Sequence, residues 1–248
     1  MPKVSNLFTD YNGTLEPRYL EISLAHEILD YHKKQGNISR YLNLLIPKQI
    51  KMCMGFKAGD KHKLMKSYVN DVLRGEDKTI IESAAERAAQ RKTKVPTLMK
   101  KLLGEKRIFG RSDPKVKELF RKAKESGMTT GIYTGALLDL IIPNLEEECL
   151  FYYFDHLMGN KILYNNSAVS GLEENVFNGK KGLSEYLLSI DLKPKDTAFI
   201  DNEDIEPLTQ VGIGIAAPTS KTRFRDECRE RQIYTPNSWE EIAEILEI

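Results

Sequence analysis

Several segments of this sequence place side chains suited to chemistry directly after short apolar runs. The first apolar run, near the N-terminus, ends in Asp10 and continues into a turn that contains Gly13. A carboxylate at the end of a strand is well placed to act as a nucleophile, although an acid in this position also serves as a turn or capping residue. Asp10 by itself leaves both interpretations open, and the later segments favour chemistry.

The second such segment follows an apolar run over 130–133, which we expect to form a strand. It continues with Thr134 and Gly135, a hydroxyl group and a flexible residue that allow backbone amides to face an anion at the start of the next helix. We expect that helix to begin near Ala136. Thr134 fits its N-cap equally well, and the two roles are compatible.

A basic pair and an acidic cluster follow in the C-terminal half. Lys180 and Lys181 precede an expected helix, where an ammonium group could neutralise a phosphate, although surface lysines are common. Asp201 ends an apolar run and is followed by Glu203 and Asp204. Carboxylates that converge repel one another unless a cation lies among them, and oxygen ligands of this kind suit Mg²⁺. A solvated acidic turn with an N-cap at Asp204 is the alternative.

Short strands that alternate with helices are expected around these residues. Such alternation predicts an α/β fold, a Rossmann-like parallel sheet sandwiched by helices. Strands are expected over 4–9, 130–133, 197–200 and 213–216, and helices over 115–126, from about 136, and over 183–190, 205–210, 221–231 and 239–246.

The segment between the first strand and the remaining ones reads differently. Residues from about 19 to 103 have helical periodicity with almost no strand signals. Because one strand precedes this segment and the others follow it, it is best interpreted as an insertion. We therefore expect an α/β core domain of residues 1–15 plus 110–248 and an all-helical cap of residues 16–109. Open parallel sheets bind ligands at the carboxyl ends of their strands, where the residues above lie.

Composition narrows the function classes. The 248 residues carry a net charge near +1 without a long basic or acidic block, which argues against nucleic acid or a membrane as partner. The three cysteines, Cys53, Cys149 and Cys228, lack metal-ligand spacing, and no apolar run approaches the roughly 18 residues of a membrane span. We expect a cytoplasmic protein, and the oligomeric state stays open.

An Asp at a strand end, a Thr, a Lys and an acidic cluster, in this order, resemble the four motifs of the haloacid dehalogenase-like hydrolase superfamily. Residues 111–135, which begin RSDPKVKELF and end TGIYTG, and residues 154–182, with FDHLMGNKIL, VSG and GKKG, are similar to its phosphoserine-phosphatase-like branch. The match covers residues 1–15 and about 110–248, and only the helical character of the cap.

The resemblance implies a Mg²⁺-dependent phosphomonoester hydrolase that forms an aspartyl-phosphate on Asp10 and acts on a small phosphorylated metabolite. It also assigns a role to each motif. Asp10, the backbone carbonyl of Asn12 and the carboxylate of Asp201 would hold Mg²⁺, completed by Asp204 or Glu203; Thr134, Gly135 and Lys181, or Lys180 as the alternative, would bind phosphate.

Asn12 departs from the pattern, because phosphatases of this superfamily carry a second Asp there as general acid and base. An amide cannot donate and recover a proton in this way, and general acid–base catalysis contributes roughly 10²- to 10⁴-fold in rate. The fourth motif departs as well: Ile200 stands where a Gly often precedes the Asp, and the spacing from Asp201 to Asp204 is short.

Three explanations for Asn12 remain. The first is a weakened phosphatase in which the cap supplies a substitute acid. The second is a catalytically impaired protein that still binds a phosphate ligand. The third is a non-phosphatase hydrolase, dehalogenase-like or phosphonatase-like, that does not need this acid.

The cap carries the choice of substrate, and there the sequence says least. Glu16, Arg18 and Glu21 follow the nucleophile turn and could meet a charged group of a substrate, but we interpret them as exposed charges that flank a helix start. None of the four histidines has a ligand-like partner in the sequence, and we assign none to catalysis.

Overall fold

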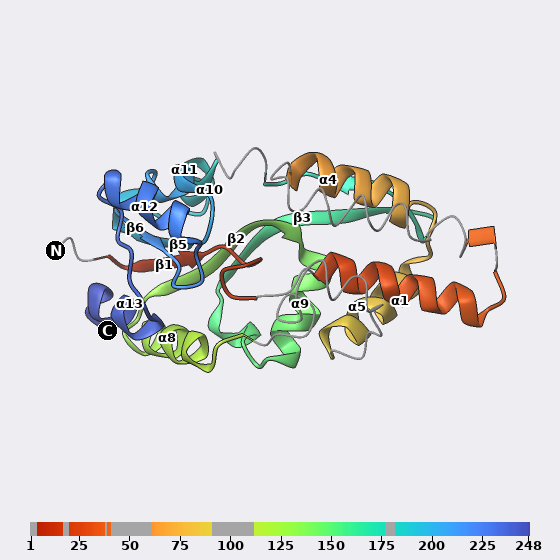
Figure 1. Ribbon diagram of the computed structural model, residues 1–248, viewed down its shortest axis with the longest axis horizontal. Coiled ribbons are helices and arrows are strands. Elements are labelled where there is room, and N and C mark those ends of the chain that lie inside the picture. The colour runs from red at the N-terminus through yellow and green to blue at the C-terminus, as the bar shows by residue number, and fades with distance from the viewer. Residues whose placement is uncertain (1–3, 17–19, 38, 41–60, 91–111, 177–181) are drawn as a thin grey trace.

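The computed structural model describes residues 4–16, 20–37, 39–40, 61–90, 112–176 and 182–248 (Figure 1). Its centre is a six-stranded, mostly parallel sheet in the order β4-β3-β2-β1-β5-β6. The strands are β1 (Asn6–Thr9), β2 (Thr129–Leu137), β3 (His156–Asn165), β4 (Ala168–Glu173), β5 (Thr197–Asp201) and β6 (Ile213–Ala216).

The short strand β1 occupies the middle of this sheet. It pairs in parallel with β2 on one side and with β5 on the other, and Thr9 lies opposite Ile132 and Ile200. All four of its residues are buried, as expected of a strand covered on both faces. The α/β fold class predicted from the alternation of strands and helices is therefore confirmed.

The antiparallel hairpin of β3 and β4 was not predicted. Asn166 and Ser167 form its turn, both with positive φ, of 47° and 66°. Two-residue hairpin turns require this left-handed backbone, which Asn tolerates better than most residues. The sequence lacks the Asn-Gly or Asp-Gly pair that usually marks such a turn, and the hairpin makes one edge of the sheet antiparallel.

Helices cover the sheet and lie close to the positions expected from the sequence. Helix α8 illustrates why, because Asp113 caps its N-terminus, Pro114 occupies its first turn, and one face buries apolar residues such as Phe120. The helices of this part are α8 (Pro114–Glu125), α9 (Leu138–Glu147), α10 (Leu183–Ser189), α11 (Ile205–Leu208), α12 (Thr222–Glu230) and α13 (Trp239–Leu246), with short 3₁₀ turns at Phe151–Tyr153 and Pro194–Asp196.

The described part of residues 16–109 forms helices α1 (Leu20–Lys34), α4 (Lys61–Tyr68) and α5 (Lys78–Ala89), with a π-helical turn at Val69–Leu73. Helix α1 packs against α5, and both contact α9 (Figure 1). The tip of the β3–β4 hairpin also joins this region, since Lys78 N–H donates to Ser167 O over 2.7 Å. One cluster of buried apolar residues spans these helices and the sheet. The division into core and cap domains stays a prediction.

A buried ionic contact ties the end of α1 to the segment after the π-helical turn. Glu76 is 3% exposed; its Oε2 lies 2.8 Å from His32 Nε2, and its Oε1 accepts from Arg40 Nε over 2.6 Å. Arg40 also donates to Val72 O. His32 therefore has a structural partner that the sequence did not reveal, because the two residues are far apart along the chain.

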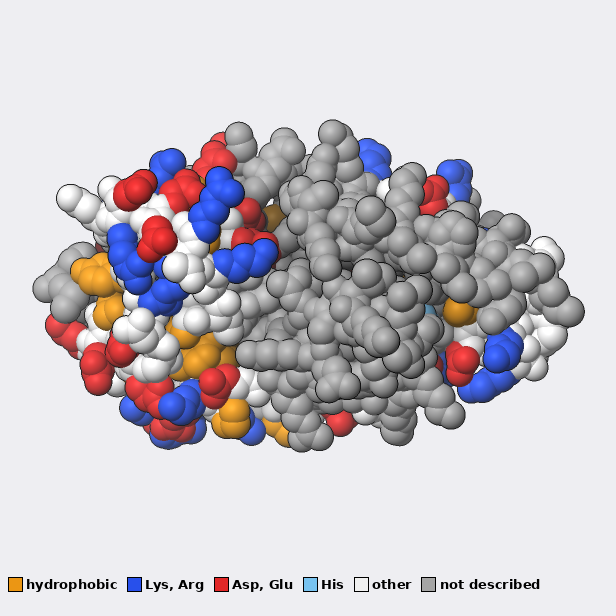
Figure 2. Space-filling model, in the orientation of Figure 1, with side chains coloured by type: hydrophobic (Ala, Val, Ile, Leu, Met, Phe, Trp, Pro, Cys, Tyr) orange, Lys and Arg blue, Asp and Glu red, His pale blue; other side chains and the backbone are white. Residues whose placement is uncertain are grey.

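Acidic and basic side chains lie intermingled on the described surface over the sheet region in the view of Figure 2, in agreement with the near-zero net charge. Among the described residues, no helix combines the length and the apolar character needed to cross a bilayer.

His26 on α1 generates a testable prediction about stability. Its side chain is buried, and its Nε2 lacks a hydrogen-bond partner in the described part of the chain. Burial lowers the pKa of His26 from 6.5 to about 4, against the opposing effect of Asp30 and Glu27. Between these pH values the unfolded chain binds a proton that the folded chain does not, so stability falls as the pH falls.

We expect this effect to remove about 2 kcal/mol of unfolding free energy between about pH 7 and pH 5. The variant His26→Leu cannot bind this proton, so its unfolding free energy should fall less over the same interval. Urea unfolding of both proteins at the two pH values measures the difference. Parallel losses in the two proteins would contradict the prediction.

Candidate active site

Two buried carboxylates lie at the point where the order of strands reverses. The chain builds β2 and β3 on one side of β1 and then returns to place β5 on the other, so β1 and β5 flank the switch point where open α/β sheets bind ligands. Asp10 follows β1 and Asp201 ends β5; they are 3% and 0% exposed. Asp10 N–H donates to Ile200 O over 2.9 Å, which aligns the two strand ends.

The turn after Asp10 is fixed by bonds to two other loops. Gly13 has a φ of +80°, and its N–H donates to Glu16 O over 2.7 Å. Thr14 Oγ1 donates to Asn202 Oδ1 over 3.0 Å, and Thr219 Oγ1 donates to Gly13 O over 2.8 Å. The loops after β1, β5 and β6 are thus joined at this edge of the sheet. Sequence reasoning missed Asn202, because only the fold brings it beside Thr14.

Asn12, which stands where the resemblance places a general acid, contacts a carboxyl group. Its Nδ2 donates to Oε1 of Glu21 over 3.3 Å, and its Oδ1 is buried without a hydrogen-bond partner among the described residues. Glu21 lies in the first turn of α1 and is 1% exposed. The contact brings a carboxyl group from α1 to the turn after Asp10.

Glu16 and Glu21 are both buried, so our interpretation of them as exposed charges is wrong. Glu16 is fully buried, and its Oε2 accepts from Asn144 Nδ2 over 2.8 Å. Asn144 also bonds the hydroxyl of Tyr11 over 2.5 Å. This network attaches the turn that follows Asp10, residues 11–16, to α9. A buried carboxylate requires hydrogen-bond donors of this kind. The local sequence does not show them, because they lie on another element. Arg18 lies outside the described residues.

Thr134 and Gly135 lie within β2, in the stretch between Tyr133 and Leu137 where its register with β3 shifts. The next helix begins at Leu138 rather than near Ala136, and Leu137 is its N-cap, so the assignment of Thr134 as an N-cap is wrong. Strand β2 pairs with β3 once more after the register shift, through Leu137 and Asn160, and α9 therefore begins later than expected. Thr134 is buried, and its hydroxyl accepts from Ala136 N–H over 3.3 Å.

Asn160 connects this region to the segment that leads to the two lysines. Its Nδ2 donates to Gly135 O over 2.8 Å, and its Oδ1 accepts from the N–H groups of Asn175 and Val176, both over 3.0 Å. Asn160 is 2% exposed. One buried amide thus holds the Thr134–Gly135 segment of β2 against the chain that precedes residues 177–181. Lys180 and Lys181 themselves lie outside the described residues.

The acidic cluster is arranged mainly through its backbone. Asp201 Oδ1 accepts from the N–H groups of Glu203 and Asp204 over 2.9 and 3.1 Å. The Glu203 side chain is exposed, and Asp204 is half-buried at the N-cap of α11 without a side-chain capping bond. In the described part of the chain, no group of three or more His, Cys, Asp or Glu side chains is arranged to hold a metal ion. The roles of Glu203 and Asp204 stay predictions.

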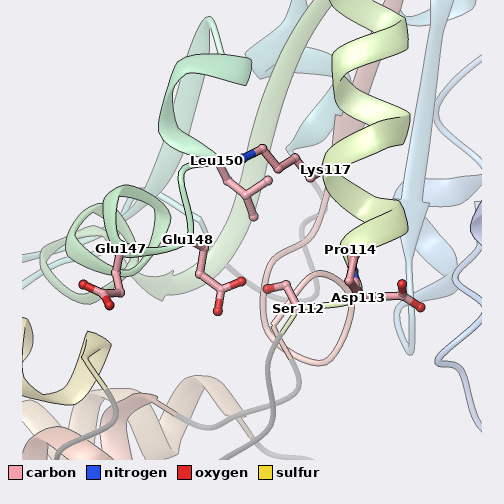
Figure 3. A pocket seen from close by; sticks show the side chains of 7 residues that line it. All are labelled: Ser112, Asp113, Pro114, Lys117, Glu147, Glu148 and Leu150. Carbon is pink, nitrogen blue, oxygen red and sulfur yellow. The ribbon is translucent and has the colours of Figure 1, made fainter.

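A separate pocket of about 280 Å³ lies between the N-terminus of α8 and the C-terminus of α9 (Figure 3). None of the residues that we predicted for the site lines it. Its walls carry charged groups of both signs from the two helix ends, and the lining residues are Ser112, Asp113, Pro114, Lys117, Glu147, Glu148 and Leu150.

Comparison with known proteins supports the fold at low sequence identity. No family model matches the chain, and no curated protein matches it. A substrate-bound phosphoserine phosphatase is 13% identical, with 99% of this chain and 100% of that chain covered and a TM-score of 0.62. A phosphoserine phosphatase with an analogue of its phospho-aspartyl intermediate is 16% identical over 98% and 99% of the two chains, with a TM-score of 0.60.

A HAD family hydrolase from Salmonella enterica serovar Typhi is 14% identical over 94% of this chain and 68% of its own, with a TM-score of 0.59. The chain has the haloacid dehalogenase-like fold. The likeness to the phosphoserine-phosphatase-like branch, which the motifs predicted, is confirmed at the level of the fold. In this haloacid dehalogenase-like fold, Asp10, Thr134 and Asp201 come from three neighbouring strands of the sheet, Thr134 from within β2.

The turn after Asp10 generates a prediction about Gly13. A Cβ atom at this position would lie 2.5 Å from Asn202 Nδ2, and the positive φ adds a backbone cost of about 1–2 kcal/mol. We therefore expect Gly13→Ala to lower the unfolding free energy by more than this backbone cost and to disturb the Thr14–Asn202 bond. Urea unfolding measures the change.

Gly36 offers a matched control. Its φ is +69°, and an added Cβ would meet no atom of the described residues within 4 Å. Gly36→Ala should therefore show the backbone cost alone. Equal destabilisation by the two substitutions would mean that the close approach of Asn202 to Gly13 is not constraining the turn.

Proposed function

We propose that the chain is a phosphomonoester hydrolase of the haloacid dehalogenase-like type, with Asp10 as the nucleophile and a small phosphorylated metabolite as the substrate. The observation that supports this proposal best is the burial of Asp10 beside Asp201 at the switch point of the sheet. Attack by Asp10 on phosphorus would form an aspartyl-phosphate, which water then hydrolyses.

The oxygen donors at this edge of the sheet suit Mg²⁺. Two buried carboxylates on adjacent strands would repel each other, and a cation between them removes that cost. Asp10, Asp201 and the backbone carbonyl of Asn12 would hold the ion, with Asp204 or Glu203 completing the site. When bound, Mg²⁺ would neutralise charge on the transferring phosphoryl group.

The remaining motifs would position the phosphate. The Thr134 hydroxyl and the Gly135 backbone lie on the strand next to β1 and would bind phosphoryl oxygens, while Lys181, or Lys180 in its place, would supply a positive charge. Support comes from Asn160, which holds Gly135 and the chain leading to the lysines together.

A binding protein without turnover is the second candidate, and Asn12 is the observation that favours it. Loss of the general acid costs most for esters with poor leaving groups, so a site of this kind could retain its ligand but not hydrolyse it. A dehalogenase-like reaction is the third, and it would not need Mg²⁺.

Hydrolysis of p-nitrophenyl phosphate with and without Mg²⁺ tests the proposal, because this ester has a good leaving group. We expect Mg²⁺-dependent turnover that falls by at least about 10³-fold in Asp10→Asn, since the amide is not a nucleophile. Asp226→Asn is the matched control: its carboxylate is exposed and pairs with Arg229 on α12, so turnover should not change.

Three results would reject the proposal in different ways. Turnover that survives in Asp10→Asn would remove Asp10 from the reaction. Absence of turnover, together with Mg²⁺-dependent binding of inorganic phosphate that Asp10→Asn weakens, would favour the binding protein. Dehalogenation of a haloacid without Mg²⁺ would favour the third candidate.

A further inference from the structure

The pairing of β2 with its neighbours is interrupted beside the proposed phosphate site. Within the described part of the sheet, β2 pairs with β1 over residues 129–132 and with β3 over residues 131–133 and again at Leu137. Residues 134–136, which include Thr134 and Gly135, lie in the gap. A contact other than a ladder pair must therefore fix this backbone if it is to present donors to a phosphoryl group.

Asn160 on β3 supplies such a contact. Its Nδ2 donates to Gly135 O over 2.8 Å, and its side chain is shielded from water, with 2% of the residue exposed. The preceding residue, Gly159, lies close to the same stretch, since an added Cβ would be 3.0 Å from Ala136 O. The side chain of Asn160 thus takes the place of a ladder bond where the ladder is interrupted.

The other end of the same amide binds the chain that leads to the two lysines. Asn160 Oδ1 accepts from the N–H groups of Asn175 and Val176, both over 3.0 Å. Because two N–H groups face one end of the amide and a carbonyl faces the other, only this orientation satisfies all three bonds. Asn175 Nδ2 also donates to Gly159 O over 3.3 Å, which adds a second bond between the same segments.

The chain that follows residues 177–181 also lies beside β2. An added Cβ at Gly182 would be 3.4 Å from the hydroxyl oxygen of Tyr133, which is 3% exposed on β2. Tyr133 shares a buried apolar cluster with Val176 and Leu183. Both described neighbours of the lysine segment are therefore connected to the strand that carries Thr134 and Gly135.

We propose that Asn160 is a positioning residue for the phosphoryl group. It fixes the Thr134–Gly135 segment relative to the chain that enters residues 177–181, so that groups from both motifs meet one phosphate. The proposal rests on the phosphate site proposed above, and it makes two motifs that are far apart in the sequence depend on one buried amide.

The role requires a side chain that donates and accepts at once. A Leu of similar size does neither. An ionised Asp can accept from the two N–H groups but cannot donate to Gly135 O, whereas a protonated Asp can do both. Burial and the facing carbonyl oxygen raise the pKa of a carboxyl group introduced at this position. Lowering the pH should therefore restore the missing donor in Asn160→Asp.

Calorimetric titration of the full chain with inorganic phosphate in the presence of Mg²⁺ tests the proposal. The dissociation constant of each variant is divided by that of the unchanged chain at the same pH. We expect Asn160→Leu to raise this ratio by about 10- to 100-fold at about pH 8 and at about pH 5.5, as is typical when a group that orients ligand-binding residues is lost. Asn160→Asp should raise it similarly at the higher pH and much less at the lower pH.

The two variants together exclude a purely electrostatic effect, because an anion at position 160 could repel phosphate but a Leu could not. Asn6 offers the matched control. It is 3% exposed on β1, and its Nδ2 donates to Asp196 O over 3.3 Å and to Thr197 Oγ1 over 3.1 Å, at the end of the strand opposite to Asp10. Asn6→Leu and Asn6→Asp also remove buried bonds of an amide and should leave the ratio at about 1.

Folded Asn160→Leu that binds phosphate as tightly as the unchanged chain would overturn the proposal. If circular dichroism shows that this variant does not fold, equal affinity of Asn160→Asp and the unchanged chain at both pH values has the same meaning. Equal losses in the Asn160 and Asn6 variants would overturn it too, because they would reflect general destabilisation. So would an unchanged chain that binds no phosphate with Mg²⁺.

These outcomes are distinct from failure of the phosphatase proposal. In that case p-nitrophenyl phosphate would not be hydrolysed, or its turnover would survive in Asp10→Asn, while phosphate would still bind to the unchanged chain and bind more weakly to Asn160→Leu.

Discussion

The placement of β1 between two parallel neighbours is the constraint on which the candidate site depends. A four-residue strand has few hydrogen bonds of its own, but β2 and β5 pair with β1 from both sides and fix its register. The backbone hydrogen bonds to β2 and to β5 therefore together position Asp10 at the carboxyl edge of the sheet. The same register places Asp201 on the adjacent strand, so one pairing determines the relative position of both carboxylates.

Burial of these acids explains why the surrounding loops are so extensively bonded. A buried carboxylate is costly unless donors or a cation compensate for lost hydration. Two backbone N–H groups donate to Asp201, and Asn144 donates to Glu16. The Thr14–Asn202 bond joins the loops that carry Asp10 and Asp201. These bonds at the edge of the sheet thus compensate for the burial of charge.

The positions of Asp10 and Asp201 could be predicted because strand ends can be recognised locally: an apolar run stops and a polar residue follows. Thr134 was expected at a strand end as well, but β2 continues past it to Leu137. Residues that act across elements could not be found in this way. Asn202, Asn160 and the His32–Glu76 pair acquire their roles only from partners far along the chain. The β3–β4 hairpin was missed for a different reason, because Asn166 and Ser167 adopt positive φ without the glycine that usually signals it.

The burial of Glu21 also shows why charge alone is a poor guide to exposure near a site. A Glu in the first turn of a helix has an ordinary explanation as a favourable partner of the helix dipole. Here the same residue is buried because Tyr68 of α4 bonds its backbone oxygen and because Asn12, in the turn after Asp10, contacts its side chain. Both causes are tertiary contacts.

The pairing of Asn12 with Glu21 offers a physical reason for an amide at a position where a carboxylate is expected. Two ionised carboxylates at a separation of about 4 Å repel each other by roughly 1 kcal/mol in water and about 4 kcal/mol near a protein surface. With Glu21 buried and 3.3 Å from the side chain at position 12, a second acid would have to share a proton with it or disturb the turn. The amide replaces that repulsion by a hydrogen bond.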